Sequence, residues 1–146
     1  MGKIKRTLRI IGWREFMAIP QLKIKKIKVK VDTGARTSAL HVSDLKIIKR
    51  KSKRFAEFTV HPKQKSLRPQ YKIRTKVTGF KIIKSSNGIS SKRPVIEANI
   101  KLGKLTKKIE ITLVNRDLMG FRMILGRTVL KNDFLVDTGR SFLLSE

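Results

Sequence analysis

Apolar and charged residues alternate along much of the chain, which is typical of β-strands with one buried and one solvated face. Single lysines separate Ile27, Val29 and Val31, and residues 55–60 and 108–114 show the same two-residue period. By the same reasoning we predict further extended segments at residues 7–11, 16–19, 38–42, 71–83, 94–100, 134–136 and 141–144. The pattern therefore predicts a mainly β protein built as a small barrel or a sandwich.

Three local signals refine this pattern. The apolar positions change phase at Lys25-Lys26, which predicts a turn or a bulge there. Asn87-Gly88 lies between two of the predicted strands and predicts a hairpin, because this dipeptide tolerates the positive φ of a tight turn. Residues 127–131 are the only helical candidate of note, and that helix would be short.

Length and composition limit the class of protein. The 146 residues are enough to bury an independent core, so we expect one domain over residues 1–146. A hydrophobic content of 40% is typical of a globular chain, and the lack of cysteine excludes disulfides and thiolate metal sites. We find no apolar run of about 20 residues and no signal peptide, so we expect a cytoplasmic protein without a membrane partner.

The charge is unusual, with 36 Lys plus Arg against 10 Asp plus Glu and a net charge of +26. A field of this sign attracts polyanions such as nucleic acid, ribosomes or acidic peptides. The lysines are spread along the chain and alternate with Ile and Val, as solvated strand faces do. Two interpretations stay open, a general preference for basic, soluble proteins or an acidic substrate or ribosomal neighbour.

The candidate chemistry follows the strand at residues 27–31, in Asp32-Thr33-Gly34. A catalytic carboxylate must be held at the tip of a rigid loop, where glycine permits close approach of a neighbouring backbone. The threonine hydroxyl can hold such a loop by hydrogen bonds. A second stretch, residues 123–127 (MILGR), is an apolar strand that ends at glycine and leads into the predicted helix.

Together these two stretches resemble the two parts of one retropepsin lobe, in which an apolar-apolar-glycine strand passes beside the catalytic loop. The match extends to Gly12-Trp13-Arg14-Glu15, residues 31–41, Ser86-Asn87-Gly88, Arg93-Pro94-Val95 and residues 115–127. From about Gly12 to Leu144 the chain is similar to the bacterial retropepsin-like family. Members are often labelled "ATP-dependent zinc proteases", and some are associated with a glutamate ligase that acts on a ribosomal protein. The resemblance implies a small, closed or partly open acid-protease barrel with one short C-terminal helix.

The resemblance also implies roles for individual residues. Asp32 would be the catalytic carboxylate, positioned by Thr33 and Gly34. The residues expected to contact substrate are Ala35, Arg36, Asn87, Gly88, Arg93 and Arg116. The residues expected to support the loop are Ile124, Leu125, Gly126 and Arg127. In an alternative account Arg36 and Arg127 are both structural and either pair with Asp117 or Glu15 or brace the dimer, and for Arg127 the resemblance favours the subunit contact. The Asn87-Gly88 hairpin is expected to be either a lid over the cleft or an ordinary surface hairpin.

The aspartic mechanism needs two carboxyl groups that share a proton, and one lobe supplies one. Asp137-Thr138-Gly139 repeats the tripeptide, but only seven residues follow Gly139, too few for another lobe. We therefore expect Asp137 to be structural, at a turn before a last strand, and a homodimer to pair two copies of Asp32. An intrachain role for Asp137 is the alternative.

The sequence lends little support to a metal or a nucleotide cofactor. His41 and His61 are the only histidines, and neither belongs to an HExxH motif. The chain also lacks a GxxxxGK[ST] phosphate loop. We therefore predict no metal site and no cofactor; a weak metal site at His41 with the nearby Asp44 is the alternative.

The sequence thus predicts a hydrolase, an aspartic endopeptidase whose protein or peptide substrate is expected to be acidic, such as a glutamate-rich tail. A second interpretation is a generic retropepsin that cuts extended apolar peptides. The alternative from another class is a weakly active or inactive retropepsin-fold protein that binds ribosomes, RNA or acidic partners through its basic surface. Association with a ribosomal protein is an expectation that belongs to the second interpretation of the charge, in which it serves an acidic substrate or a ribosomal neighbour.

Overall fold

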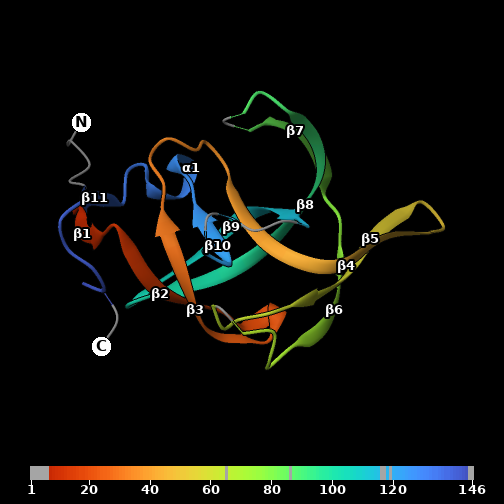
Figure 1. Ribbon diagram of the computed structural model, residues 1–146, viewed down its shortest axis with the longest axis horizontal. Helices are drawn as coiled ribbons and strands as arrows, with labels where there is room; N and C mark the ends of the chain where they lie inside the picture. Colours follow the sequence, from red (N-terminus) through yellow and green to blue (C-terminus); the bar gives the residue numbers. More distant parts are fainter. Residues whose placement is uncertain (1–6, 65, 86, 116–117, 119, 145–146) are drawn as a thin grey trace, which may run out of the picture.

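A closed ring of strands forms the centre of the protein (Figure 1). Strand β10 (Met123–Leu125) pairs with β3 (Ile24–Val31) on one side and with β4 (Ser38–Arg50) on the other, and so joins the ends of the sheet. From β3 the ring continues through β2 (Arg14–Ile19), β8 (Ser90–Leu102) and β9 (Leu105–Val114) back to β4. This computed structural model describes residues 7–64, 66–85, 87–115, 118 and 120–144, and it confirms the predicted barrel.

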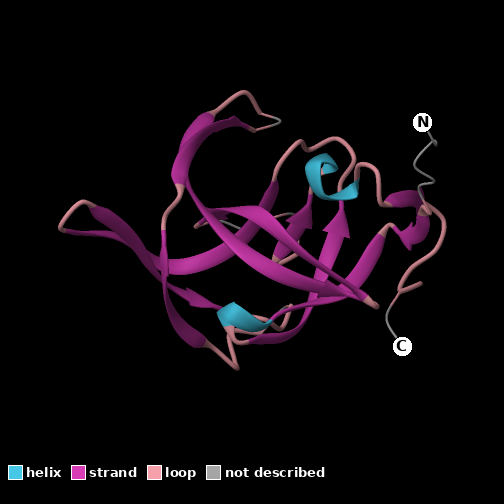
Figure 2. Ribbon diagram, turned by 180° about the vertical axis from the view of Figure 1, so that it is seen from behind, coloured by secondary structure: helices cyan, strands magenta, loops and turns pink. Residues whose placement is uncertain are grey.

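Further strands extend or flank the ring. Strands β5 (Lys53–Val60) and β6 (Tyr71–Lys76) continue the sheet beyond β4, and β7 (Gly79–Lys84) pairs with β8. Strands β1 (Arg9–Gly12) and β11 (Phe134–Asp137) form a separate parallel pair. The helices are a 3-10 turn, η1 (Pro20–Leu22), and α1 (Arg127–Leu130), both visible in Figure 2. Among the described residues, neither helix has the length or the apolar run that crossing a membrane requires.

The predicted irregularity at Lys25-Lys26 is a β-bulge. Met17 lies opposite Ile27, and Ile19 lies opposite Ile24. Between these two pairs β3 has one residue more than β2. The bulge lets Ile24 and Ile27 both face the core while the two lysines between them stay exposed. A single β3 strand therefore carries both apolar phases that the sequence shows.

The interior of the barrel is filled by aliphatic side chains from every strand of the ring. Ile27, Val29 and Val31 are buried, whereas the intervening Lys28 and Lys30 are half-buried at the barrel surface. The strand patterning thus agrees with the sequence prediction that the lysines occupy the outer faces of strands. The barrel provides a rigid base for the loop that follows Val31.

Two predicted elements were wrong. The stretch 71–83 is two strands, because Val77 N donates to Arg54 O and Thr78 N donates to Val95 O, so the chain changes pairing partner there (2.9 and 2.8 Å). Residues 141–144 do not form a strand; they lie against the β1–β2 turn instead.

Candidate active site

Asp32 lies on a tight turn directly after β3. Its backbone N–H donates to Leu125 O (2.9 Å), and the Ala35 N–H donates to Asp32 O (3.2 Å). The Gly34 N–H donates to Asp32 Oδ1 (3.0 Å), which fixes the rotamer of the carboxylate. The side chain is half-buried, so one carboxylate oxygen is oriented by the loop while the group still reaches solvent. Such an oriented carboxylate is suited to act on a water or on a carbonyl group.

The loop is held by the segment that follows β10. Glycine is required at the crossing, the point where the backbone of this segment passes the backbone of the loop. A Cβ on Gly126 would lie 2.6 Å from Thr37 C and 2.9 Å from Arg36 C. The N–H of Arg127 donates to Ala35 O (2.8 Å), and the N–H of Thr128 donates to Arg36 O (3.2 Å). The two backbones could not make these bonds at this separation if a side chain stood between them.

Ser38 completes this crossing, and sequence reasoning missed it. Its hydroxyl accepts a hydrogen bond from Gly126 N (3.0 Å), and its carbonyl accepts one from Thr112 Oγ1 (2.9 Å). Ser38 is fully buried, so these bonds satisfy groups that have no access to water. The only sequence signal is a small polar residue at the start of an otherwise apolar strand. This signal does not indicate which residue would form a hydrogen bond with it.

The outer side of the loop faces away from the barrel. Arg127 Nη1 donates to Thr33 O (2.9 Å), and Thr33 is exposed. Thr33, Arg36 and Arg127 line a concavity of about 430 Å³ together with Phe134 and Val136 of β11. Arg127 therefore braces the loop at a surface shared with the β1–β11 pair. The expected ion pair of Arg127 with Glu15 does not form, because the Glu15 carboxylate binds backbone N–H groups instead.

The inner side of the loop opens into a larger cleft of about 1080 Å³. Asp32 and Ile124 lie in its wall, and residues of the β7–β8 hairpin line it from another side. The lining from the loop and the barrel includes Asp32, Gly34, Ala35, Arg36, Thr37, Ala39 and Ile124, and the lining from the hairpin includes Lys81, Ile82, Ile83, Lys84, Ser85, Asn87 and Arg93. Leu125, by contrast, points into the core.

The predicted Asn87-Gly88 hairpin is present and reaches the cleft. Lys84 pairs with Ser90, so the connection is residues 85–89, longer than a two-residue turn. Gly88 has φ +85°, and its N–H donates to Ser85 O (2.9 Å). Asn87 is among the residues that line the cleft, while Gly88 shapes the turn behind it. A lid role for this hairpin remains a prediction.

Cations outnumber carboxylates around the cleft. Arg36 and Arg93, both predicted from the sequence, line it, and Arg93 is only 6% exposed with its Nε donating to Ser91 Oγ (3.1 Å). Sequence reasoning missed Lys81 and Lys84, because β7 gives no indication of which face the hairpin turns to the loop. Lys81 Nζ lies 3.6 Å from Glu110 Oε2. Arg116 and Asp117 lie outside the described residues.

Asp137 forms a turn with the same local geometry as Asp32. The Gly139 N–H donates to Asp137 Oδ1 (3.0 Å), as Gly34 does to Asp32. However, Asp137 pairs with Gly12 at the end of β11, and among the described residues it is not part of the lining of the Asp32 cleft. The expected turn is there, but residues 141–144 after it are not a strand.

The Gly12-Trp13-Arg14-Glu15 stretch anchors the C-terminal segment. Glu15 is fully buried, and its carboxylate accepts hydrogen bonds from the N–H groups of Gly12 (2.8 Å), Leu143 (2.9 Å) and Leu144 (3.1 Å). A Cβ on Gly12 would lie 2.5 Å from Arg140 O, so this position also requires glycine. These residues therefore have a structural role next to the loop.

The histidines do not form a zinc site. His41 Nδ1 is 2.9 Å from Arg122 Nη1, and His61 Nε2 is 2.6 Å from Ser43 Oγ while its Nδ1 is 3.0 Å from Leu67 O. A guanidinium against an imidazole nitrogen is a poor environment for a cation. Within the described part of the chain, no three His, Asp or Glu side chains are grouped to hold a metal ion. The described residues therefore do not fit zinc.

Comparisons with known proteins agree with this geometry. A family model described as "Retropepsin-like aspartic endopeptidase RimB" matches residues 10–146. Two curated relatives, from Shewanella pealeana and Desulfotalea psychrophila, are each named "Probable alpha-L-glutamate ligase" and are 44% and 38% identical over 94% of this chain. The chain spans about 30% of the length of these relatives. The solved structure of Lpg0085, a Legionella pneumophila protein with unknown function, superposes with a TM-score of 0.76 at 26% identity over 95% of this chain and 100% of that one.

Proposed function

Because the chain belongs to the RimB-like family of retropepsin-like aspartic endopeptidases, we propose that it hydrolyses peptide bonds with Asp32 as the catalytic carboxylate. One observation carries this proposal. The Asp32 carboxylate is oriented by Gly34 N–H in the wall of a cleft of about 1080 Å³, on a loop that is hydrogen-bonded to the segment at β10. Rigid support of this kind is what a proton-transferring group requires.

The reaction needs a second carboxyl group. One carboxylate takes a proton from water as the water oxygen attacks the scissile carbonyl carbon, and the protonated carboxyl gives its proton to the carbonyl oxygen. The tetrahedral intermediate then collapses: the C–N bond breaks, the amine nitrogen receives a proton, and the new carboxyl product leaves. Two carboxyl groups close together hold one proton between them, because two negative charges at that distance repel.

We propose that a second copy of the chain supplies the other Asp32. The outward side of the loop, with Thr33 exposed, faces the same region as the β1–β11 pair. On this pair Ile10 lies opposite Leu135, and both side chains are 56% exposed. Paired exposed aliphatic side chains on a short open sheet support an interface with another protein surface. A twofold axis there would bring two copies of one loop together.

The proposed substrate is an acidic, glutamate-rich peptide. The curated relatives carry names of probable glutamate ligases, and a peptidase domain within such a protein would act on glutamate-containing chains. The cations that line the cleft, Arg36, Arg93, Lys81 and Lys84, support the same substrate class. Arginine in particular can bind a carboxylate with two parallel hydrogen bonds.

Asp137 offers a matched control for testing the catalytic role of Asp32, because it has the same tripeptide and the same turn. Cleavage of a glutamate-rich peptide and of a neutral peptide of equal length would be followed by mass spectrometry at low and high salt. We expect Asp32→Asn to lower the rate of cleavage by orders of magnitude, and Asp137→Asn to cleave at the rate of the wild type. We expect the glutamate peptide to be preferred, less so at high salt or in Arg36→Ala. Normal turnover by Asp32→Asn would refute the aspartic mechanism, and loss in Asp137→Asn alone would make that residue the catalytic one.

A further inference from the structure

The hairpin between β4 and β5 projects away from the barrel (Figure 1). We call residues 46–54 at its end the basic ribbon, and they contain no carboxylate. The cations of the basic ribbon are Lys46, Lys49, Arg50, Lys51, Lys53 and Arg54, and all of them are exposed. Among the described residues, no Asp or Glu side chain forms an ion pair with any of them. The basic ribbon is therefore a concentrated positive charge without internal compensation.

The strand register places like charges opposite each other. Lys49 lies opposite Arg54, and Arg50 lies opposite Lys53. Consecutive residues of a strand face opposite sides, so each face of the basic ribbon carries one cationic pair. Directly opposed like charges destabilise a hairpin. A local arrangement that costs stability in this way is expected where an anionic ligand compensates for it.

A groove beside the basic ribbon extends the positive surface. Its volume is about 620 Å³, and Lys49, Lys51 and Arg54 line it beside Phe80. The guanidinium carbon of Arg54 lies 5.5 Å from the centre of the Phe80 ring, and Lys92 Nζ lies 5.0 Å from it. No lining residue is shared between this groove and the Asp32 cleft, as far as the described residues go. The positive surface is thus separate from the proposed active site.

We propose that the basic ribbon binds double-stranded nucleic acid by entering a groove between the two phosphate rows. A two-stranded β-ribbon fits the major groove of B-form DNA, and phosphates line both edges of that groove. Cations on both faces of the basic ribbon match that arrangement. An acidic peptide presents one row of carboxylates and would leave one face uncompensated. The major groove of A-form RNA is too narrow and deep for side chains to read, so B-form DNA is the better fit.

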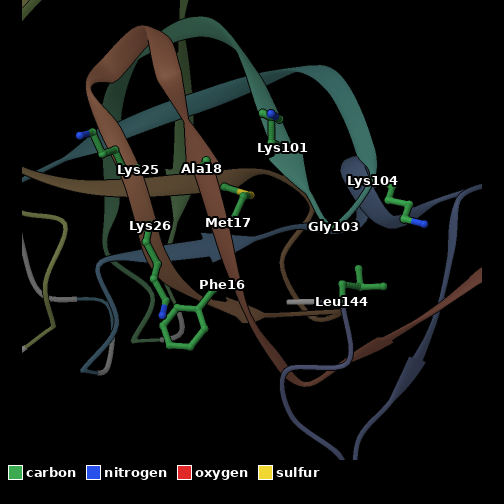
Figure 3. Close-up of a pocket in the computed structure, with 9 residues that line it drawn as sticks. All are labelled: Phe16, Met17, Ala18, Lys25, Lys26, Lys101, Gly103, Lys104 and Leu144. Atoms are coloured by element: carbon green, nitrogen blue, oxygen red, sulfur yellow. The ribbon is translucent and has the colours of Figure 1, made fainter. Parts of the chain in front are cut away.

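The protein offers a control that removes the same amount of charge elsewhere. Four lysines surround a separate concavity of about 430 Å³ next to Met17 and Ala18. Figure 3 shows Lys25 and Lys26 together on β3, with Lys101 on β8 and Lys104 in the turn after it, on the other side of β2. The ribbon variant is Lys49→Gln, Arg50→Gln, Lys53→Gln and Arg54→Gln, and the control variant is Lys25→Gln, Lys26→Gln, Lys101→Gln and Lys104→Gln. Both variants lose four positive charges, so a difference in DNA affinity between them reflects where the charges lie rather than the net charge.

The test is fluorescence anisotropy of a labelled DNA duplex of about two helical turns, titrated with each full-length protein at several salt concentrations. We expect the ribbon variant to reduce the slope of log K against log salt by about 3 to 4, since each phosphate contact contributes about 0.9. The control variant should keep the slope of the wild type. Asp32→Asn should also keep it, because DNA binding does not depend on the proposed peptidase activity. Thermal unfolding checks that each variant is folded.

Several results would overturn the proposal. Equal loss of affinity in the ribbon and control variants would mean that the total charge, rather than the basic ribbon, attracts DNA. Single-stranded DNA or duplex RNA that binds as tightly as duplex DNA would exclude entry into a B-form groove. Polyglutamate that binds the wild type more tightly than the duplex, with this preference lost in the ribbon variant, would identify an acidic protein as the partner instead.

Discussion

Replacement of Gly126 by alanine tests the crossing that holds the candidate catalytic loop. The added Cβ would lie 2.6 Å from Thr37 C, 2.7 Å from Thr37 O and 2.9 Å from Arg36 C, all of them backbone atoms. A good carbon–carbon contact needs about 3.5 Å, so the two backbones must separate by about 1 Å. Backbone atoms cannot rotate away as the end of a flexible side chain can. The strain therefore has to be taken up by the loop or by the segment after β10.

The expected consequences are a loss of stability and a larger loss of activity. Overpacking of a tight site costs about 1–3 kcal/mol. At about 2–4 °C per kcal/mol for a chain of this size, the melting temperature should fall by about 2–12 °C. The bonds of Arg127 N to Ala35 O and Gly126 N to Ser38 Oγ span this crossing, so the Asp32 loop should shift with it. A misplacement of about 1 Å at a catalytic group costs about 100-fold in rate.

The assay compares Gly126→Ala with Gly79→Ala by thermal unfolding and by peptide cleavage. Gly79 is a fair control because a Cβ there would meet no heavy atom within 4 Å and its φ is not positive. We expect Gly79→Ala to keep stability and activity close to those of the wild type. If Gly126→Ala had the melting temperature of the wild type and cleaved peptide at the same rate, the close crossing would not support the loop. That result would refute this reasoning.

Other changes probe the surrounding structure. Glu15→Ala would leave the N–H groups of Gly12, Leu143 and Leu144 without their acceptor, so chemical denaturation should show a loss of about 3–5 kcal/mol, with Glu15→Gln milder. Ser38→Ala would leave the buried Gly126 N–H unsatisfied and should cost about 1–3 kcal/mol by the same measurement, together with part of the peptidase activity. In contrast, Arg74→Gln removes an exposed ion pair with Glu57 and should change stability by less than about 1 kcal/mol, so a large loss there would contradict the view that surface pairs contribute little.

The sequence predicted those parts of the fold that depend on local pattern. The phase change at Lys25-Lys26 was visible because a bulge is a property of one strand and its apolar positions. The relation between Asp32 and Gly126 could be predicted because the resemblance links the two stretches. The break after Lys76 could not, because β6 and β7 are both rich in strand-forming residues and differ only in their pairing partners.

Other features depend on contacts between distant parts of the chain. The segment at residues 141–144 has the composition of a strand, but its N–H groups bind the carboxylate of Glu15, more than a hundred residues earlier. The cleft-facing positions of Lys81 and Lys84 depend on how the β7–β8 hairpin curves over the loop, which no alternation pattern specifies. Sequence reasoning therefore found the loop and its glycine, and missed the side chains that long-range packing brings to them.

The most direct test of the central claim is the activity of mixed wild-type and Asp32→Asn protein after subunit exchange. If the active site combines Asp32 from two copies, only dimers with two wild-type chains are fully active, so activity should fall as the square of the wild-type fraction. At equal amounts of the two proteins and constant total concentration, we predict about a quarter of the wild-type activity. A linear fall to about half would mean that each chain carries a complete site, and would contradict the account.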